Sequence, residues 1–404
     1  MSLRFIKKDG TIRILWKNFM YADIPQHLFY SILKKYGEAA EEKNEIIPKI
    51  PENLYFLFLQ DIYEVAKNKF VSLICRRKTF YIHDIPITGY NAFGIIDRGT
   101  NLLQVRPVTG CNLNCIYCSV DEGPYSKSRK VDYVVAKDLI VDEFKRIARI
   151  KKHPVEAHID GQGEPLLYPD IADVISELRD VSNVKVISMQ SNGLLLNDKV
   201  IEGLASAGLS RINISLNSFR NDVASFMAGV ENYGVERILE LIDVLLNSGI
   251  KVLLAPLILP GVNDCEIPQF IKFAREKLLP SEFPVLGIQK YIPHRFGRKV
   301  KTRVQRFYEF YNMLREYERI YKFKPLVLRA AHFGITYDCT LPKKFKRGEK
   351  ISAKIALLGR MENERIAVAR DSLIQVINCQ ADIGDRVSLR IRSTSHGVYV
   401  AECV

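Results

Sequence analysis

The sequence predicts an α/β protein built around a partial (β/α)6 barrel of parallel strands, with a small N-terminal α+β domain and a C-terminal five-stranded β-barrel. Strand-like apolar runs alternate with amphipathic helical stretches between residues 102 and 321, an order that gives parallel strands joined by right-handed crossovers. After residue 342, short alternating strands recur between turn signals, which is typical of a small β-barrel. The predicted domains are 1–95, 96–325 and 342–404, with a linker at 326–341.

The first 95 residues do not share the repeating strand–helix pattern. Alternating residues on both sides of Asp9-Gly10 predict a β-hairpin. The stretches "PQHLFYSILKKYG" and "NLYFLFLQDIYEVAKNKF" are helix-like. These elements predict a small α+β domain, to which the sequence assigns no role.

Six strand–helix units make up the central domain. The strands begin near residues 102, 155, 184, 211, 251 and 285, and the helices cover 134–150, 170–180, 198–208, 234–249, 266–278 and 302–321. Asn197 is a good N-cap for the third helix, and Gly208 is a good stop. Six units are too few to close an eight-stranded barrel, so we expect an open, curved sheet with its chemistry at the C-terminal ends of the strands.

Composition narrows the class of protein. No run of about eighteen apolar residues occurs, so we expect no membrane span, and the N-terminus lacks the apolar stretch of a signal peptide. Eight unevenly spaced cysteines in 404 residues fit a reducing cytoplasm rather than a disulfide framework. The net charge of +13 indicates either a polyanionic partner, such as nucleic acid, or only good solubility.

Three of the cysteines stand close together in "TGCNLNCIYCSVDEG". Cys111, Cys115 and Cys118 follow the first predicted strand of the barrel, so they should lie at its mouth. Three thiolates are one short of a closed tetrahedral zinc site, but they suit a [4Fe–4S] cluster with one iron left open for an external ligand. Three buried structural cysteines are the alternative, which the polar loop disfavours.

The motif "CNLNCIYC", with Tyr117 before the third cysteine, resembles the cluster motif of the radical S-adenosylmethionine (SAM) superfamily. "DGQGEP" after the second strand is similar to that family's Gly-Gly-Glu motif, which holds the methionine amino group of SAM, although Gln162 interrupts the glycines. "QSNG" and "SLNS" end the third and fourth strands, and "PLILPGVND" and "GIQKYIP" follow the same order. The resemblance implies that SAM contacts Tyr117, Gly161, Gln162, Gly163, Glu164, Ser191, Asn192, Ser215, Asn217, Pro260, Gln289 and Tyr291.

The chemistry that this resemblance implies needs a [4Fe–4S] cluster, SAM and an electron donor such as ferredoxin or flavodoxin. Reductive cleavage of SAM gives a 5'-deoxyadenosyl radical, which abstracts hydrogen from a C–H bond. The three cysteines are then the expected catalytic residues and the cluster ligands, because the sequence shows no evident general base.

The tail resembles a TRAM domain, an RNA-binding barrel of the OB type, most closely at "GDRV" and "GVYVAE". The glycine-rich stretch common in that family reads here as "MENERIAVA". The basic residues that could face RNA phosphates are Arg360, Arg365, Arg370, Arg386, Arg390 and Arg392 in the tail, and Arg295, Arg298, Lys299, Lys301 and Arg303 beside the mouth. A solvated basic surface is the alternative for both groups.

The remaining cysteines decide between kinds of RNA chemistry. Radical SAM methylthiotransferases bind a second cluster through three more cysteines in an N-terminal domain, whereas this N-terminal region offers only Cys75. No cobalamin-binding domain is apparent. Methylases of RNA adenine use two extra cysteines, and Cys339 would be the first candidate for such a role, ahead of Cys265, Cys379 and Cys403.

Three functional hypotheses follow. The first is a radical SAM enzyme that modifies a nucleoside of tRNA or rRNA, for example by methylation or other C–H functionalisation. The second is a radical SAM enzyme that acts on a protein or small molecule, with the TRAM-like barrel as a partner-binding module. The third is an RNA-binding protein whose cluster is structural or regulatory, and the intact SAM motifs make it the least favoured.

Overall fold

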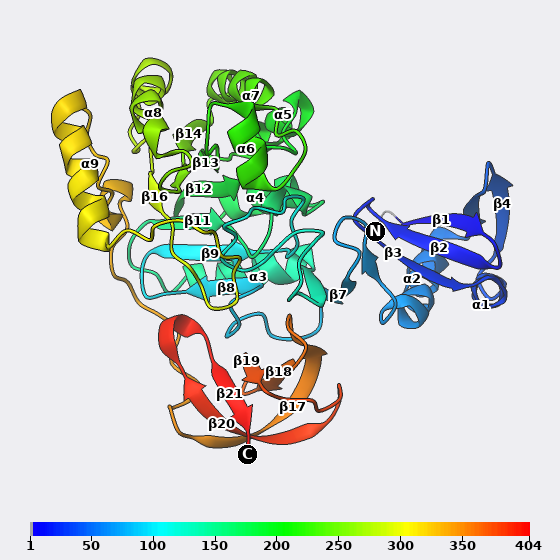
Figure 1. Ribbon diagram of the computed structural model, residues 1–404. Coiled ribbons are helices and arrows are strands. Elements are labelled where there is room, and N and C mark those ends of the chain that lie inside the picture. The colour runs from blue at the N-terminus through cyan, green and yellow to red at the C-terminus, as the bar shows by residue number, and fades with distance from the viewer. Residues whose placement is uncertain (1–2) are drawn as a thin grey trace.

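The computed structural model describes residues 3–404, in which three units follow one another along the chain (Figure 1). In Figure 1 the N-terminal unit lies to one side of the central α/β unit, and the C-terminal barrel lies below it. Among residues 3–404, no helix is both long enough and apolar enough to cross a membrane.

The N-terminal unit is a twisted sheet backed by two helices. Its strands are β1 (Leu3–Lys8), β2 (Thr11–Trp16), β3 (Met20–Pro25), β4 (Glu38–Glu42) and β5 (Glu45–Lys49), and its helices are α1 (Gln26–Leu33) and α2 (Glu52–Ala66). The predicted hairpin at Gly10 is confirmed, because β1 and β2 pair antiparallel from Leu3 to Trp16. Phe5, Phe29 and Phe58 pack together between the sheet and the helices, with ring centroids 5.1 to 6.2 Å apart.

This sheet continues into the central unit. Its order is β10-β7-β6-β3-β2-β1-β5-β4, where the strands not yet named are β6 (Val71–Ser72), β7 (Lys78–Ile82) and β10 (Val131–Val135). Strand β10 follows the cysteine loop and pairs parallel to β7. The cysteine loop is therefore attached at its end to a strand of the N-terminal sheet, a connection that the sequence did not predict.

The central sheet has the order β14-β13-β12-β11-β9-β8. Its strands are β8 (Gly94–Asp97), β9 (Leu102–Arg106), β11 (Val155–Ile159), β12 (Val184–Ser191), β13 (Arg211–Ile214) and β14 (Lys251–Leu254). All neighbours pair parallel except β8 with β9. The sixth predicted strand forms only short parallel pairings. Leu286 bridges Leu254, and β16 (Gln289–Lys290) pairs parallel to β15 (Leu257–Ile258). The predicted partial barrel is confirmed.

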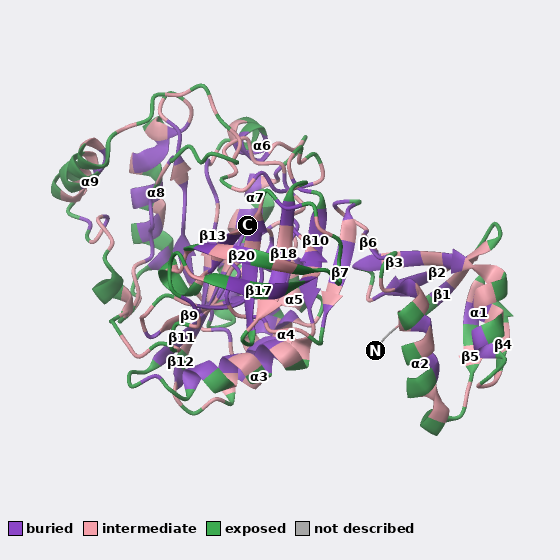
Figure 2. Ribbon diagram, turned by 90° about the horizontal axis from the view of Figure 1, so that it is seen from below, coloured by how far each residue is buried: buried purple, intermediate pink, exposed green. Residues whose placement is uncertain are grey.

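Helices surround this sheet. They are α3 (Lys137–Ala148), α4 (Ile171–Arg179), α5 (Asp198–Ser206), α6 (Asn221–Ala228), α7 (Val235–Asn247), α8 (Ile267–Phe273) and α9 (Phe307–Tyr321). Every predicted helix of the central unit is present within a few residues, and α6 is additional. The side chain of Asn197 accepts the Val200 N–H and so caps α5 as expected. Figure 2 shows the central strands mostly buried under these helices.

The C-terminal unit is a closed barrel of β17 (Lys350–Leu358), β18 (Glu364–Ala369), β19 (Ser372–Ile377), β20 (Arg386–Ser393) and β21 (Val400–Cys403). Residues of β17 alternate between exposed and buried, and the buried ones include Ile355, which packs with Ile374 and Leu389 inside the barrel. The barrel is hydrogen-bonded to the central unit, because the N–H groups of Leu373 and Tyr399 donate to the carbonyl oxygens of Thr88 and Gly89.

Candidate functional site

The three clustered cysteines lie in the loop between β9 and β10, at the C-terminal ends of the parallel strands. Cys111, Cys115 and Cys118 are half-buried and line one cavity of about 510 Å³. All the residues that the sequence assigned to the cluster and SAM line this cavity, except Gln162 and Pro260. The strand order therefore brings together motifs that are up to 180 residues apart in the sequence.

The thiols fit an iron–sulfur cluster better than a single metal ion. Within residues 3–404, no three His, Cys, Asp or Glu side chains are arranged to hold one ion, whereas the cysteines of a [4Fe–4S] cluster each bind a different iron. Backbone N–H groups already point at two of the sulfurs: Leu113 donates to Cys111 Sγ at 3.4 Å, and Glu122 donates to Cys118 Sγ at 3.2 Å. Such bonds tune the potential of a cluster.

Burial also matters for the protonation of these thiols. Desolvation raises the pKa of Cys115 to about 12 and raises the pKa of Cys111 as well. A buried thiol with a raised pKa stays protonated at neutral pH. The thiolate that binds metal forms only when a cation takes the place of this proton. The iron of a bound cluster would supply such a cation.

A close contact of two backbone segments joins the cysteine loop to the "DGQGEP" loop. The Glu164 N–H donates to the Gly110 carbonyl at 2.8 Å, and the Gly110 N–H donates to the Gln162 carbonyl at 3.3 Å. Gly163 has φ of +158°, and a Cβ there would lie 2.0 Å from the Gly110 oxygen. Glycine is therefore required at position 163, whereas the side chain of Gln162 points away from the cavity, within 3.5 Å of Arg360 Nη1.

Glu164 is a buried carboxylate of the site. It is 2% exposed and accepts hydrogen bonds from the Asn192 N–H, the Ser191 hydroxyl and the Leu166 N–H at 2.8, 2.8 and 3.1 Å. Desolvation nevertheless raises its pKa to about 7. A buried carboxylate in this state is stabilised by a cationic group placed against it, which fits the ammonium of a methionine moiety.

The opposite wall of the cavity is built by Asn217 and its partners. The Asn217 side-chain amide donates to the Tyr117 hydroxyl, and its oxygen accepts the Leu257 N–H at 2.8 Å. Asn263 donates to the Asn217 carbonyl at 2.6 Å. Pro260, which the sequence assigned to SAM, instead accepts a hydrogen bond from the Thr302 hydroxyl through its carbonyl.

Sequence reasoning missed several residues that line the cavity: His158, Asp160, Gln190, Tyr233 and His294. The sequence could have indicated the first three. They stand at or just beyond the C-terminal ends of β11 and β12, and the alternation of side chains along a strand places them on the cavity face. No such signal existed for Tyr233, whose hydroxyl donates to the Asn192 carbonyl at 2.7 Å from the start of α7.

Arg360 does not lie on the barrel surface, and its predicted contact with RNA is wrong. It is 1% exposed, and its guanidinium pairs with Glu122 at 2.5 Å and with Asp132 at 3.0 Å. Arg77 approaches the same two carboxylates from the N-terminal unit, at 3.1 and 3.0 Å. These four side chains form a buried charge network directly behind the cysteine loop.

Arg298 also has a different role from the predicted one. Its guanidinium donates to Asp121 at 2.8 Å and to the carbonyl oxygens of Cys115 and Glu122 at 3.0 and 2.6 Å. Its N–H donates to the Cys118 carbonyl. Arg298 therefore fixes the segment after β16 against the cysteine loop and is not free for phosphate.

The other basic residues predicted to bind RNA differ in their exposure and in whether they have an ion-pair or hydrogen-bond partner. Arg295, Lys299, Lys301 and Arg386 are exposed, and Arg390 is half-buried. Arg392 is paired with Glu402 and Arg370 with Glu349. Arg365 donates to the Ala381 carbonyl within the barrel.

Cys339 is far from the cluster loop, so a direct catalytic role for it is excluded. Its neighbour Tyr337 bridges Thr100, just before β9 begins, and the Asp338 N–H donates to the Gly99 carbonyl. This is the N-terminal edge of the sheet, whereas Cys111 follows its C-terminal edge. Cys265 is exposed beside α8, and Cys379 and Cys403 lie together in the barrel with their sulfurs 3.0 Å apart.

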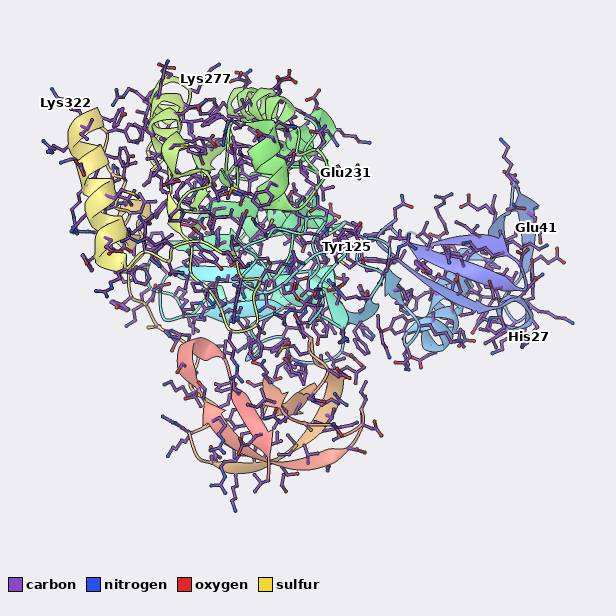
Figure 3. The ribbon with its side chains drawn as sticks, viewed as in Figure 1. His27, Glu41, Tyr125, Glu231, Lys277 and Lys322 are labelled. Atoms are coloured by element: carbon purple, nitrogen blue, oxygen red, sulfur yellow. The ribbon has the colours of Figure 1, made fainter. Side chains whose placement is uncertain are left out.

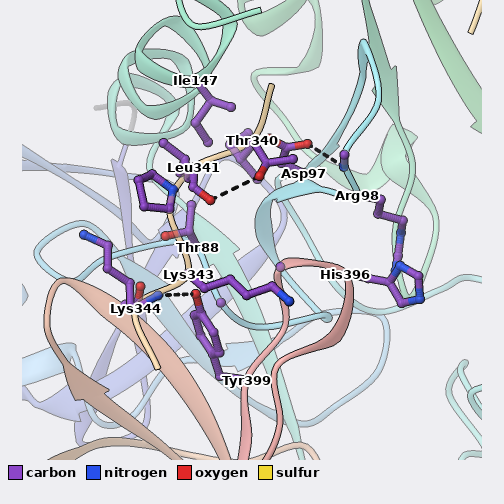
Figure 4. A pocket seen from close by; sticks show the side chains of 16 residues that line it. Thr88, Asp97, Arg98, Ile147, Thr340, Leu341, Lys343, Lys344, His396 and Tyr399 are labelled. Atoms are coloured by element: carbon purple, nitrogen blue, oxygen red, sulfur yellow. Dashed lines mark hydrogen bonds between the residues drawn. The ribbon is translucent and has the colours of Figure 1, made fainter. Parts of the chain in front are cut away.

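A second cavity, of about 170 Å³, lies between the C-terminal barrel and the central unit (Figure 4). Asp97, Lys344 and Tyr399 are among the residues that line it, and the Lys344 N–H donates to the Tyr399 hydroxyl at 3.0 Å. No residue of the cysteine, glycine or asparagine motifs lines this cavity.

Comparisons with known proteins identify relatives of the chain. A family model described as "Radical SAM superfamily" matches residues 105–274. The Uncharacterized protein MJ0103 of Methanocaldococcus jannaschii is 40% identical over 380 residues, which cover 88% of each chain. A GTP 3',8-cyclase of Clostridium botulinum (strain Hall) is 31% identical over 180 residues, 44% of this chain and 54% of that one. The match thus spans about half the length of the cyclase.

Solved structures are similar at lower identity. SuiB of Streptococcus suis bound to S-adenosylmethionine is 17% identical, with a TM-score of 0.41, over 68% of this chain and 54% of that one. Native anSMEcpe with bound AdoMet is 17% identical, with a TM-score of 0.42, over 55% and 62% of the two chains.

The raised pKa of Glu164 predicts a pH dependence of stability. Between its ordinary value of 4.5 and about 7, the folded, cluster-free protein holds a proton that the unfolded chain has lost, so the free energy of unfolding falls as pH rises. The loss is about 1.4 kcal/mol per pKa unit, or about 3 kcal/mol in all. Glu164→Gln removes this loss, so its melting temperature relative to wild type should rise between pH 5 and 7.5.

The control for this measurement is Glu231→Gln, which changes an exposed glutamate labelled in Figure 3. Its melting temperature should follow that of the wild type across the same pH range. If the melting temperatures of Glu164→Gln and wild type differ by the same amount at every pH, the raised pKa of Glu164 is wrong, because a titrating group produces a difference that changes with pH.

The buried network predicts that Arg360 stabilises the cysteine loop. Arg360→Met leaves Glu122 without one of its two cations, and removing one partner of a buried pair costs about 3–5 kcal/mol. We expect chemical denaturation to show this loss, and Arg360→Lys to recover part of it. Arg386→Met, an exposed arginine of the same barrel, should change stability by less than about 0.5 kcal/mol. Equal effects of Arg360→Met and Arg386→Met would disprove the role.

Proposed function

Because the chain belongs to the radical SAM superfamily, we propose that it modifies a nucleoside of tRNA or rRNA by radical chemistry. As a radical SAM enzyme it uses a [4Fe–4S] cluster and SAM, and it needs an external electron donor, for which ferredoxin or flavodoxin is our proposal. When bound, the cluster and SAM supply reductive cleavage of the sulfonium and a carbon radical that abstracts hydrogen.

The chain's own residues bind and orient these groups. Cys111, Cys115 and Cys118 hold the cluster, and the buried Glu164 carboxylate would accept from the methionine amino group. The segment fixed by Arg298 covers the outer side of the cysteine loop, where Gly297 approaches so closely that a Cβ would lie 2.7 Å from the Ser119 oxygen. This cover limits the access of water to the cluster.

The observation that carries the RNA proposal is the basic segment 292–306 at the mouth of the cavity. Tyr291, Ile292 and His294 line the cavity itself. The exposed basic residues that follow are Arg295, Lys299, Lys301, Arg303 and Arg306. Of these five, Arg303 alone forms an ion pair with another described residue, Glu309. A polyphosphate backbone would therefore be drawn to the entrance of the site.

A second basic surface, the β17–β20 face, supports the same proposal. Lys354 stands opposite Arg386 in the register, and Lys350 stands opposite Arg390, with Ser352 opposite Ser388 between them. Like charges directly opposite each other destabilise a sheet. None of these four residues forms an ion pair within residues 3–404. The ion pairs on the barrel surface are those of Arg370 and Arg392. An anionic partner would relieve this repulsion.

A second candidate is a small-molecule substrate, as the name GTP 3',8-cyclase states for the relatives that match about half of their length. A protein substrate belongs to the same alternative. Under either, the barrel would serve as a partner-binding module, and RNA would leave the reaction unaffected.

The decisive experiment is anaerobic assay of 5'-deoxyadenosine with reconstituted protein, dithionite and SAM, with and without bulk tRNA and rRNA. We expect RNA to increase product formation, and mass spectrometry of digested RNA to find a modified nucleoside. Product that is indifferent to RNA would favour a small molecule or protein. If a preparation with a full cluster forms no 5'-deoxyadenosine, the proposal that the chain is an enzyme of this kind is wrong.

The β17–β20 face predicts a change in the salt dependence of RNA binding. Replacing Lys350, Lys354, Arg386 and Arg390 by glutamine removes four phosphate contacts, each of which contributes about −0.7 to the slope of log K against log salt. The slope should therefore become less negative by about 3. Surface substitution is preferable to removing the barrel, because deletion after residue 341 would also remove Arg360. The measurement is filter binding between 50 and 200 mM salt.

The matched control removes the same charge elsewhere. Lys8, Lys34, Lys43 and Lys69 are exposed lysines of the N-terminal unit, and their replacement by glutamine lowers the net charge by the same four units. An equal fall in slope for both variants would show non-specific attraction and would remove the β17–β20 face from the proposal.

A further inference from the structure

We infer that an aromatic cavity beside the SAM cavity holds the target base of the RNA by stacking it against α9. The inference rests on the proposed function and names the part of the site that receives the substrate. This cavity, which we call the stacking pocket, has a volume of about 360 Å³ and is lined by residues of α9, β12, β13, β14 and β16.

The stacking pocket adjoins the place where the reacting carbon would arise. Gln190, Gln289, Lys290 and Ile292 line both cavities. These four residues therefore form the shared wall between the stacking pocket and the cavity of the cysteines. A group held in the pocket needs no long channel to present an atom to the SAM cavity.

The aromatic wall comes from one face of a helix. Phe307, Phe310, Tyr311 and Leu314 follow the i, i+3, i+4, i+7 spacing along α9, and all four line the pocket. Phe310 and Leu314 are 3% and 1% exposed and serve as core. In contrast, Phe307 is 54% exposed and Tyr311 is 36% exposed. Their rings are nearly parallel, at 27° with centroids 6.1 Å apart.

Two open rings side by side at the edge of a cavity are suited to stack on a planar heterocycle. Base–aromatic stacking is a common way in which proteins hold unpaired bases, because every base has a π-face. Lys290 Nζ lies 4.8 Å from the centroid of Phe307. The same ammonium donates to the Tyr291 carbonyl at 3.1 Å, so a base that stacks on this face of Phe307 would displace Lys290 toward the phosphate backbone.

Polar groups on the facing wall match the edge of a base. Gln190 and Asn213 are direct partners in the register of β12 and β13, so their side chains share one face. The Gln190 amide donates to Ser215 Oγ at 2.8 Å, and the Asn213 oxygen accepts from Arg211 Nε at 3.3 Å. The Gln190 oxygen and the Asn213 NH₂ remain as one acceptor and one donor that no other described side chain engages. An adjacent acceptor and donor can pair with a base edge.

The first test uses fluorescence at the pocket. Trp16 is the only tryptophan of the chain and lies buried in the N-terminal unit. Because its Nε1 has no partner among the described residues, Trp16→Phe should be tolerated. In the double variant Trp16→Phe/Phe307→Trp the emission comes from the pocket alone. We expect saturating bulk tRNA to quench it, and an abasic oligonucleotide of the same charge to leave it unchanged.

The control reporter is Trp16→Phe/Tyr308→Trp, on the neighbouring face of the same helix. Tyr308 is 59% exposed and does not line the pocket, so its emission should not respond. If tRNA binds in a filter assay but the reporter at 307 does not respond, or responds equally to the abasic chain, the inference is wrong while the proposed function stands. If tRNA does not bind at all, the proposed function fails first.

The second test separates stacking from simple filling of the pocket. Phe307→Leu keeps an apolar side chain without a ring, and we expect it to lower RNA-dependent kcat/KM by about 5-fold or more, because stacking of one base is worth a factor of about 5 to 150. Phe307→Trp should retain activity. Formation of 5'-deoxyadenosine without RNA should be unchanged in both, as should the apparent affinity for SAM.

Tyr308→Leu is the matched control and should behave as wild type. Equal activity of Phe307→Leu and Phe307→Trp would show that the ring is not used, and would overturn the inference. Quenching of the reporter by an aromatic peptide, but not by tRNA, would assign the pocket to a protein substrate instead and would overturn it as well.

Discussion

The site depends on the buried network of two arginines and two carboxylates behind the cysteine loop. Arg77 comes from the N-terminal unit and Arg360 from the C-terminal barrel, and both pair with Glu122 and Asp132. Glu122 also donates its N–H to Cys118 Sγ. Taking such charges out of water is costly unless every one is paired, so the three units must come together for the loop to adopt one conformation. The barrel is thus part of the scaffold of the site.

The same loop is fixed on its other side by contacts of the backbone. Gly110 donates its N–H to the Gln162 carbonyl and accepts the Glu164 N–H, which brings it so close to Gly163 that a side chain there is excluded. Arg298 donates to the carbonyl oxygen of Cys115. The cavity is therefore shaped by three sequence segments that meet on one loop. Its outer part, the basic segment and α9, belongs to the chain after the last strand of the barrel. Under the proposed function, the strands hold the cofactors and the later segment receives the substrate.

Much of this arrangement could be predicted from the sequence. Apolar runs of four to eight residues between amphipathic helices predicted the parallel sheet, and the placement of Glu164, Ser191 and Asn217 after successive strands brought them to one cavity. The roles of Arg360 and Arg298 could not be predicted. Arg360 lies 228 residues from Asp132, and an arginine at the end of a strand has the same local pattern whether it meets water or a buried carboxylate. Likewise, nothing in the local sequence of β10 indicated that it would pair with β7.

The distance along the chain between Arg360 and its carboxylates has a consequence for biosynthesis. The cysteines leave the ribosome long before the strands of the barrel are made, and domains generally fold as units during synthesis, N-terminal first. Until the final strands exist, Glu122 and Asp132 have only Arg77 as a counter-charge, and the loop behind which they lie is incomplete. The loop therefore gains its full set of counter-charges only when the last strand of the barrel, which ends at Cys403, has been made.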